Sequence, residues 1–233
     1  MGRLFNLDSP IMNGLNKLAD LIILNFLTMI CCIPLFTIGA AMTALHYVTL
    51  KIVRDEETYI IRSYFKSFKE NFKQATVIWL IMLVVAGVII GDIAIFNYSS
   101  IEFPSWIKVA LLAIGFLFLF GTVHVFPVLS HFNNTIKSTF RNSLFMGILA
   151  LPKTVIMMVC WVVPIILAAY VMVIFPIVIM LGISGPAFIC ALLYSSTFKR
   201  FEPEQEAPVS DEEWTVSIEG EQEEPAEENT VQE

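Results

Sequence analysis

Long apolar runs, separated by short polar segments, make up most of the first 200 residues of the chain. A helix needs about 20 predominantly apolar residues to cross the hydrocarbon layer of a bilayer, so runs of this length predict membrane-spanning helices. The 45 positions from Thr154 to Phe198 carry no charged residue. A single helix of that length would measure about 68 Å, more than twice the layer's thickness of about 30 Å, so two spans are expected there. In all, the pattern predicts spans over residues 18–33, 35–53, 75–96, 107–130, 154–172 and 175–198.

The first apolar run is ambiguous, because proline and glycine interrupt it in the stretch CCIPLFTIGAA, residues 31–41. A turn from Pro34 to Gly39 gives a hairpin and six spans, whereas a kink gives one span there and five in total. Lys and Arg favour the cytoplasmic side of a membrane. The hairpin places 13 of them on that side against Lys108 alone, and the kinked span places 11 against 3. The charges favour six spans with both termini inside, and Thr37 and Gly39 are expected to help satisfy the backbone of the turn.

Two polar connections between the spans predict short amphipathic helices. In the connection 54–74, an apolar stripe at helical spacing (Ile61, Phe65, Phe68 and Phe72) adjoins a basic stripe (Arg62, Lys66, Lys69 and Lys73). Such a helix lies in the membrane surface, with its cations against anionic headgroups and its Phe rings inserted. Alternatively, the helix packs under the bundle. The connection 132–144 repeats the design more weakly, with Ile136, Phe140 and Leu144 on one face and Lys137 and Arg141 beside it.

Composition supports the same class of protein and separates a tail from the rest of the chain. Of the 233 residues, 57% are hydrophobic and 15% are charged, against about 25% charged in soluble domains. Residues 1–200 carry all 14 Lys and Arg against 8 acidic residues, a net charge of +6, whereas residues 201–233 carry 13 acidic and no basic residues. We expect an all-α integral membrane protein. Its bundle of about six transmembrane helices (alternatively five) spans residues 1–200, and a disordered, acidic, cytoplasmic tail follows over 201–233.

Polar residues inside spans are costly, which makes them the first candidates for a functional site. Here they are Asp20, Asn25, His46, Asp92 and His124. In the hairpin, Asp20 and His46 lie at nearly the same depth, about 21 and 18 Å from Pro34. A polar cluster of Asp20, Asn25 and His46 would bind a substrate, relay protons or fix a helix pair. The alternative is that Asp20, Asp92 and His124 lie near span ends and reach the interface, while Asn25 bonds another helix.

Motifs for catalysis are not found in the sequence. It contains no nucleophile elbow, phosphate-binding loop or metal-ligand cluster, which are the usual signatures of enzymatic sites. The four cysteines, Cys31, Cys32, Cys160 and Cys190, lie inside apolar runs without ligand spacing, so neither a zinc site nor a disulfide framework is expected. We therefore predict no enzymatic activity, no catalytic residue, no cofactor, no metal and no nucleic-acid partner.

Four segments in the N-terminal half appear in a characteristic order over residues 4–80: FNLDSP, LADLIILNF, CCIPLFTIGAAMTAL and LKIVRDEETYIIRSYFKSFKENFKQA. Together they resemble the YesL family of small bacterial multi-pass membrane proteins. Further along, VFPVLSHFNNTIKSTFRNSL and LPKTV look similar, while the acidic tail has no counterpart in the family. The resemblance implies a bacterial cytoplasmic membrane and no assigned activity. Genes of the family often lie beside carbohydrate uptake and sensing systems.

Two functions remain as expectations. The first is a non-enzymatic accessory or regulatory partner of a membrane system such as carbohydrate uptake or sensing. Its partners would be a transporter or sensor kinase complex and the anionic headgroups of the bilayer. The alternative is a small transporter or channel subunit that uses intramembrane Asp and His residues, although few polar residues would line its path.

Overall fold

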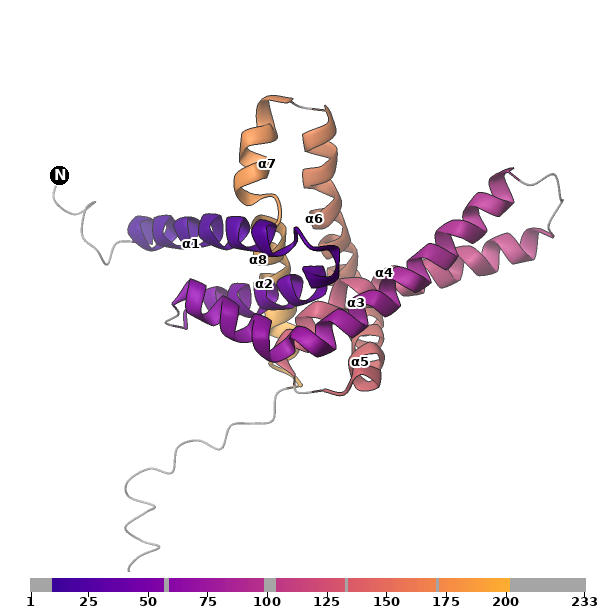
Figure 1. Ribbon diagram of the computed structural model, residues 1–233, viewed down its shortest axis with the longest axis horizontal. Coiled ribbons are helices and arrows are strands. Elements are labelled where there is room, and N and C mark those ends of the chain that lie inside the picture. The colour runs from indigo at the N-terminus through magenta and orange to yellow at the C-terminus, as the bar shows by residue number, and fades with distance from the viewer. Residues whose placement is uncertain (1–9, 57–58, 99–103, 133, 171, 202–233) are drawn as a thin grey trace, which may run out of the picture. The chain divides into compact units, whose positions relative to one another are not determined.

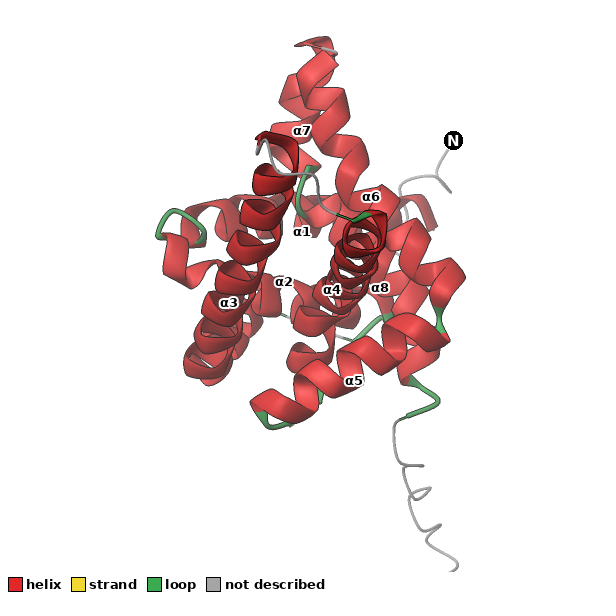
Figure 2. Cartoon of the chain, turned by 90° about the vertical axis from the view of Figure 1, so that its right-hand side faces the viewer, coloured by secondary structure: helices red, strands yellow, loops and turns green. Residues whose placement is uncertain are grey.

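Every regular element in the described part of the chain is a helix. The computed structural model describes residues 10–56, 59–98, 104–132, 134–170 and 172–201 (Figures 1 and 2). The helices are α1 (Pro10–Cys31), η1 (Leu35–Thr37), α2 (Ile38–Val53), α3 (Ile60–Tyr98), α4 (Ser105–His131), α5 (Ile136–Leu149), α6 (Leu151–Tyr170), η2 (Met172–Ile174), α7 (Phe175–Leu181) and α8 (Ser184–Phe198). The chain divides into two compact units, Met1–Thr197 and Phe198–Glu233. The predicted acidic tail lies outside the described residues, apart from Phe201.

Five segments are long and apolar enough to cross a membrane: Met12–Cys31, Leu35–Val53, Ile60–Tyr98, Ser105–His131 and Leu151–Tyr170. A sixth results if α7 and α8, which meet at an angle of 54°, are counted as one bent span. These six segments correspond in order to the six spans that the apolar runs predict. The helices thus agree with the predicted spans in order, length and apolar composition.

The first apolar run reverses direction at Pro34. Helix α1 ends at Cys31, and α2 runs back beside it (Figure 1). Leu24 of α1 and Leu45 of α2 belong to one buried cluster, as expected for antiparallel neighbours. The Thr37 hydroxyl lies 2.6 and 2.7 Å from the carbonyl oxygens of Cys31 and Pro34, so it satisfies the backbone of the turn as predicted.

Gly39 has a different role from the one predicted. It lies inside α2 and is buried against α3, not in the turn. A Cβ atom at this position would lie 2.5 Å from the carbonyl oxygen of Ala75 and 2.7 Å from the Cβ of Trp79. The missing side chain therefore lets α2 and α3 approach closely. Trp79 also reaches the turn, because its indole N–H donates to the carbonyl oxygen of Leu35 at 2.9 Å.

The predicted surface helix over 61–73 is not a separate element, because it continues without interruption into the span as α3. The reason is local: no proline or glycine stands between Ile60 and Ala86 to end the helix. The buried stripe is also shifted by one position from the predicted one, and it runs through Ile60, Tyr64, Ser67, Ala75, Ile78 and Met82. Ile61 and Phe65 are exposed, whereas Phe68 and Phe72 are half-buried against the core. Along this stretch one face of the helix packs on its neighbours, and the basic stripe stays exposed.

The second amphipathic connection forms α5. Its buried residues are Thr139, Ser143, Met146 and Gly147. The predicted apolar face of Ile136, Phe140 and Leu144 is only half-buried, and Lys137 and Arg141 are exposed. The stripe is displaced here as well, because close contact with α4 selects small side chains: a Cβ at Gly147 would lie 3.1 Å from the carbonyl oxygen of Phe120.

Helix α2 forms the centre of the described core. Eleven of its residues are buried: Gly39, Ala40, Ala41, Thr43, Ala44, Leu45, His46, Val48, Thr49, Leu50 and Ile52. One of its faces joins a cluster with α1 and the beginning of α3, and Ala40 joins a second cluster with the middle of α3 and the end of α4. A helix buried on most of its circumference is surrounded by other helices, so residues on α2 can contact several of them.

Candidate functional site: buried polar contacts between the helices

Asn25 of α1 reaches the bend between α7 and α8. Its Nδ2 donates to the carbonyl oxygen of Ile179 at 2.7 Å. Its Oδ1 accepts from the backbone N–H groups of Ile183 and Ser184 at 2.9 and 3.0 Å. The side chain is completely buried. One amide therefore bridges both sides of the bend and restores hydrogen bonds that a continuous helix would have made itself.

The chemistry of asparagine suits this position. The first N–H groups of a helix and the last carbonyls of the one before it lack partners inside their own helices. An amide carries its donor and its acceptor on two separate atoms, so it can reach both sides of the bend. An ionised carboxylate has no donor, and a hydroxyl has its donor and acceptor on a single oxygen atom. Asn25 acts as an N-cap for α8 that is supplied by another helix instead of by the adjacent residue. The Ser184 hydroxyl is also buried and has no hydrogen-bond partner among the described residues.

His46 of α2 lies among aromatic side chains from α6 and α8. Its Nδ1 is 3.3 Å from the hydroxyl of Tyr194. The imidazole meets the rings of Trp161 and Tyr194 edge-on, with centroids 6.3 and 5.9 Å apart. Both His46 and Tyr194 are almost wholly buried. The pair joins α2 to α8 in the interior.

His124 of α4 forms a second buried contact. Its Nε2 is 3.0 Å from the hydroxyl of Thr154 at the start of α6. The same hydroxyl lies 3.0 Å from the carbonyl oxygen of Gly147, so the contact joins α4, α5 and α6. The Nδ1 of His124 is buried and has no hydrogen-bond partner among the described residues. His124 is buried in the protein core.

Asp20 does not join Asn25 and His46 in a hydrogen-bonded group. It is half-buried on α1 and makes no hydrogen bond or ion pair with another described residue. The contacts of Asn25 lead to the bend, and those of His46 lead to Tyr194. The predicted cluster is thus replaced by two separate contacts, while Asp20 lies outside both. Asp92, the other candidate acid, is half-buried in the outer part of α3.

The four residues of the predicted basic stripe, Arg62, Lys66, Lys69 and Lys73, are all exposed on the first part of α3. Nearby, Lys17 of α1 pairs with Asp55 at 2.6 Å, and Lys51 of α2 pairs with Glu56 at 3.7 Å. The Lys17–Asp55 pair joins α1 to the segment that follows α2, at the end of the hairpin where α3 begins. Basic residues of three helices therefore lie at this end, and two of them are paired with acidic residues.

Sequence reasoning missed Trp161, Thr154 and Tyr194 as partners of the buried imidazoles. Their positions in apolar runs gave no signal, since a lone aromatic or hydroxyl residue is ordinary in a span. The partner of His46 lies 148 residues away in sequence, and that of His124 lies 30 away. Only the packing of the helices brings these groups together.

We expect the contact between His46 and Tyr194 to be weakly stabilising. Tyr194→Phe removes the hydroxyl and should lower the free energy of unfolding in detergent micelles by about 1 kcal/mol. His46→Gln should cost a similar amount, and the double variant should cost less than the sum of the two. Tyr170→Phe is the matched control, because Tyr170 is 85% exposed. Additive losses would show that the two side chains touch without coupling.

Residues 21–93 match the model of a family described as a protein of unknown function, DUF624. The matched segment includes Asn25 and His46 and ends in the outer part of α3. It leaves out α7 and α8, which supply the partners of both residues. No curated protein and no solved structure matches the chain.

Proposed function

We propose that this chain is a non-enzymatic integral membrane protein that serves as an accessory or regulatory partner of another membrane system. The observation that carries the proposal is the amount of apolar helix surface that the fold leaves uncovered. In α3 the last buried residue is Met82, and in α4 the first is His124. The outer halves of these helices are residues 83–98 and 105–123, and their far ends extend away from the other helices (Figure 1). Helix α7 contains no buried residue.

Uncovered apolar helices are stable only in contact with lipid or with other helices, because water would face a large hydrophobic surface. Within a bilayer, a helix satisfies its own backbone and can be surrounded by either. The face of α3 that carries Val84 and Val88, which are 68% and 59% exposed, is available for a membrane-spanning partner. A pair of helices that projects from the bundle is better suited to contact another protein than to enclose a path for a solute.

The polar residues of the interior support the same proposal. Asn25, His46 and His124 each contact another group of the chain itself. A cavity lies instead between the outer halves of α3 and α4, among apolar side chains. A transport path needs polar groups that face an open cavity. Asn25, His46 and His124 are buried and do not line the cavity between α3 and α4.

The proposed membrane, its orientation and the class of partner are supported by the basic residues of α3 and by the family resemblance. The exposed Arg62, Lys66, Lys69 and Lys73 suit the anionic headgroups of a cytoplasmic leaflet, which would place both termini in the cytoplasm. The resemblance to the YesL family supports a bacterial cytoplasmic membrane. It also supports a partner in carbohydrate uptake or sensing, either a transporter or a sensor kinase complex.

A second candidate function is a small transporter or channel subunit. One observation favours it: α7 and α8 form a broken helix whose bend is capped by Asn25 from another helix. Broken spans with helix ends near the middle of the bilayer are typical of the binding sites of secondary transporters. In this chain the N-terminus of α8 is already occupied by Asn25, which leaves fewer groups for a solute.

Purification from native membranes separates the two functions. The tagged full chain, extracted in a mild detergent after brief crosslinking, is expected to retain membrane proteins of an uptake or sensing system in a fixed ratio. Val88→Trp should reduce this retention at least several-fold, because it adds bulk to the free face of α3. Trp substitution of the exposed Val155 on α6 is the matched control. A chain that purifies alone, and that carries solute into liposomes, would support the transporter function instead.

A further inference from the structure

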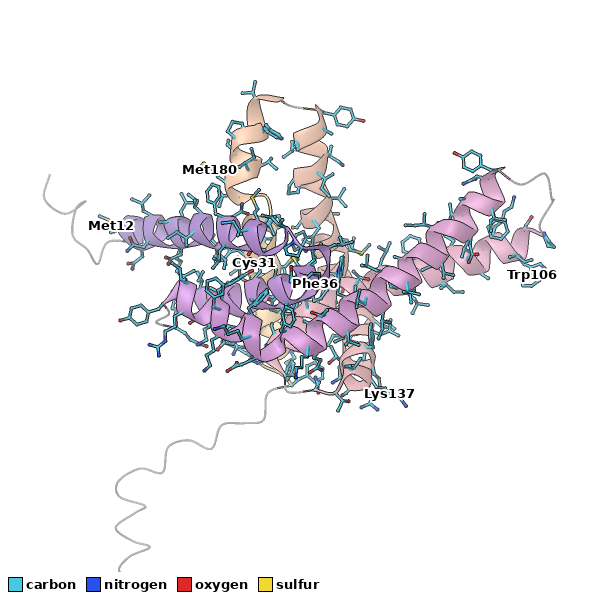
Figure 3. All side chains as sticks on the ribbon, in the orientation of Figure 1. Met12, Cys31, Phe36, Trp106, Lys137 and Met180 are labelled. Atoms are coloured by element: carbon cyan, nitrogen blue, oxygen red, sulfur yellow. The ribbon has the colours of Figure 1, made fainter. Side chains whose placement is uncertain are left out.

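A cavity of about 580 Å³ lies between the outer halves of α3 and α4. Its walls are apolar along most of their length, as at Ile90 of α3 and Phe116 of α4. Two lining residues differ from the rest: Asn97, one residue before the end of α3, and Lys108, in the first turn of α4. Both lie at the same end of the helix pair. Figure 3 labels Trp106, two residues before Lys108, at that end.

The cavity is therefore a long apolar slot with a cation at one end. On α3 it runs from Ala86 to Asn97, which corresponds to about 16 Å along a helix. Lys108 is the single charged residue among those that line it. An acyl chain matches the apolar length, and a phosphate matches the cation. These are the two parts of a phospholipid, and lysine near a membrane surface attracts anionic headgroups.

The open space between the two helices extends to a glycine of α4. Gly115 lines the cavity, and a Cβ atom there would meet no atom within 4 Å. Glycine usually lets membrane helices touch. At this position the two helices remain apart and the space stays open.

We propose that the slot between α3 and α4 binds one acyl chain of an anionic phospholipid, whose phosphate is held by the ammonium group of Lys108. Asn97 would add a hydrogen bond to the headgroup region. The inference rests on the proposed function only in requiring that the helices lie in a membrane. It does not depend on a protein partner, since the slot and the face with Val84 and Val88 are on different sides of α3.

Photoactivatable lipids test the proposal on the purified full chain in phosphatidylcholine bilayers. Trace phosphatidylglycerol with a diazirine in its acyl chain should label residues of the slot, and the matching phosphatidylcholine probe should label them about five-fold less. Lys108→Gln should remove this preference. Gly115→Phe should block labelling of the slot by both probes. Gly87→Phe is the matched control, since Gly87 also has open space around it but does not line the cavity.

Ile90→Trp, which fills the slot from α3, replaces Gly115→Phe if that variant does not remain monodisperse. Equal labelling by the two probes, or labelling that survives both Lys108→Gln and Gly115→Phe, would overturn the proposal in favour of ordinary surrounding lipid. Crosslinks between the slots of two chains would overturn it in favour of a second copy. Absence of labelling over the whole chain, including the Gly87 face, would instead contradict membrane insertion and thus the proposed function.

Discussion

Replacing Gly39 by valine is expected to prevent the chain from accumulating in a folded state or to lower its free energy of unfolding by more than about 3 kcal/mol. The reason is the close approach of α2 and α3. The new Cβ would lie 2.5 Å from the carbonyl oxygen of Ala75 and 3.1 Å from its carbonyl carbon. These are backbone atoms within a helix, so they cannot move aside as the tip of a flexible side chain can. Chemical unfolding and size-exclusion chromatography in detergent micelles measure the effect.

The clash should extend to the turn between α1 and α2. If α3 moves away from Gly39, Trp79 moves with it and loses its hydrogen bond to Leu35. Gly91→Val is the control, because a Cβ at Gly91 of α3 meets nothing within 4 Å. We expect that variant to stay within about 0.5 kcal/mol of the parent chain. Unfolding of Gly39→Val at the same denaturant concentration as Gly91→Val would show that the helices separate without cost.

The positions of the spans could be predicted because hydrophobicity and helix breakers are local properties. Pro34 marks the reversal between α1 and α2, and Thr37 closes it with contacts only three and six residues away. The same local reasoning went wrong after Lys73. The polar stretch there was taken to end a surface helix, yet a change in polarity does not break a helix. No proline or glycine stands between Ile60 and Ala86, so α3 passes through this change in polarity and continues to Tyr98.

The exact face that a helix buries was harder to predict. In the first part of α3 the buried stripe includes Tyr64, whose hydroxyl lies 3.4 Å from the carbonyl oxygen of Ala41. The predicted stripe instead used Ile61 and Phe65, which are more apolar but exposed. Two stripes one residue apart differ by about 100° around a helix. Both stripes contain aromatic residues, so the sequence alone does not tell which of them packs against α2.

The polar contacts depend on long-range packing, and so they were predicted only in part. Polarity alone identified Asn25, His46 and His124 as unusual, and Asn25 does bond another helix. The structure gives Asn25 and His46 separate hydrogen bonds that do not include Asp20, because similar depth in a hairpin does not fix the direction of a side chain around its helix. Asn25 points to residues 154 to 159 positions later in the chain. The sequence around Gly182 contains no feature that predicts a cap from another helix.

The structure bears on the predicted surface-binding stripe of α3 but not on the predicted acidic tail. Arg62, Lys66, Lys69 and Lys73 lie exposed, as a surface-binding stripe requires, but their contact with anionic headgroups stays a prediction. The half-buried Phe68 and Phe72 reach the protein core, which leaves fewer aromatic rings to insert into lipid. The tail's predicted disorder falls outside the described residues.

Replacing Asn25 by leucine is expected to destabilise the chain by about 2–5 kcal/mol. The substitution keeps the volume similar but removes the three hydrogen bonds that Asn25 makes to the bend between α7 and α8. It leaves the carbonyl of Ile179 and the N–H groups of Ile183 and Ser184 without these partners. An unsatisfied buried group costs about 1–3 kcal/mol, although relaxation around a membrane helix recovers part of that. Asn16→Leu, at an exposed position of the same helix, is the matched control.

Hydrogen exchange tells whether Asn25 caps α8 or simply fills space. In the parent chain the amides of Ile183 and Ser184 should exchange slowly, because the side-chain oxygen of Asn25 accepts from both. Asn25→Leu should accelerate their exchange by at least ten-fold. Asn25→Asp retains both acceptor bonds while losing the donor to Ile179, so these two amides should stay protected even though the variant is less stable. Equal protection in the Leu variant and the parent would mean that the bend is held by packing alone. The broken span would then be a property of α7 and α8 themselves, and Asn25 would have no part in shaping it.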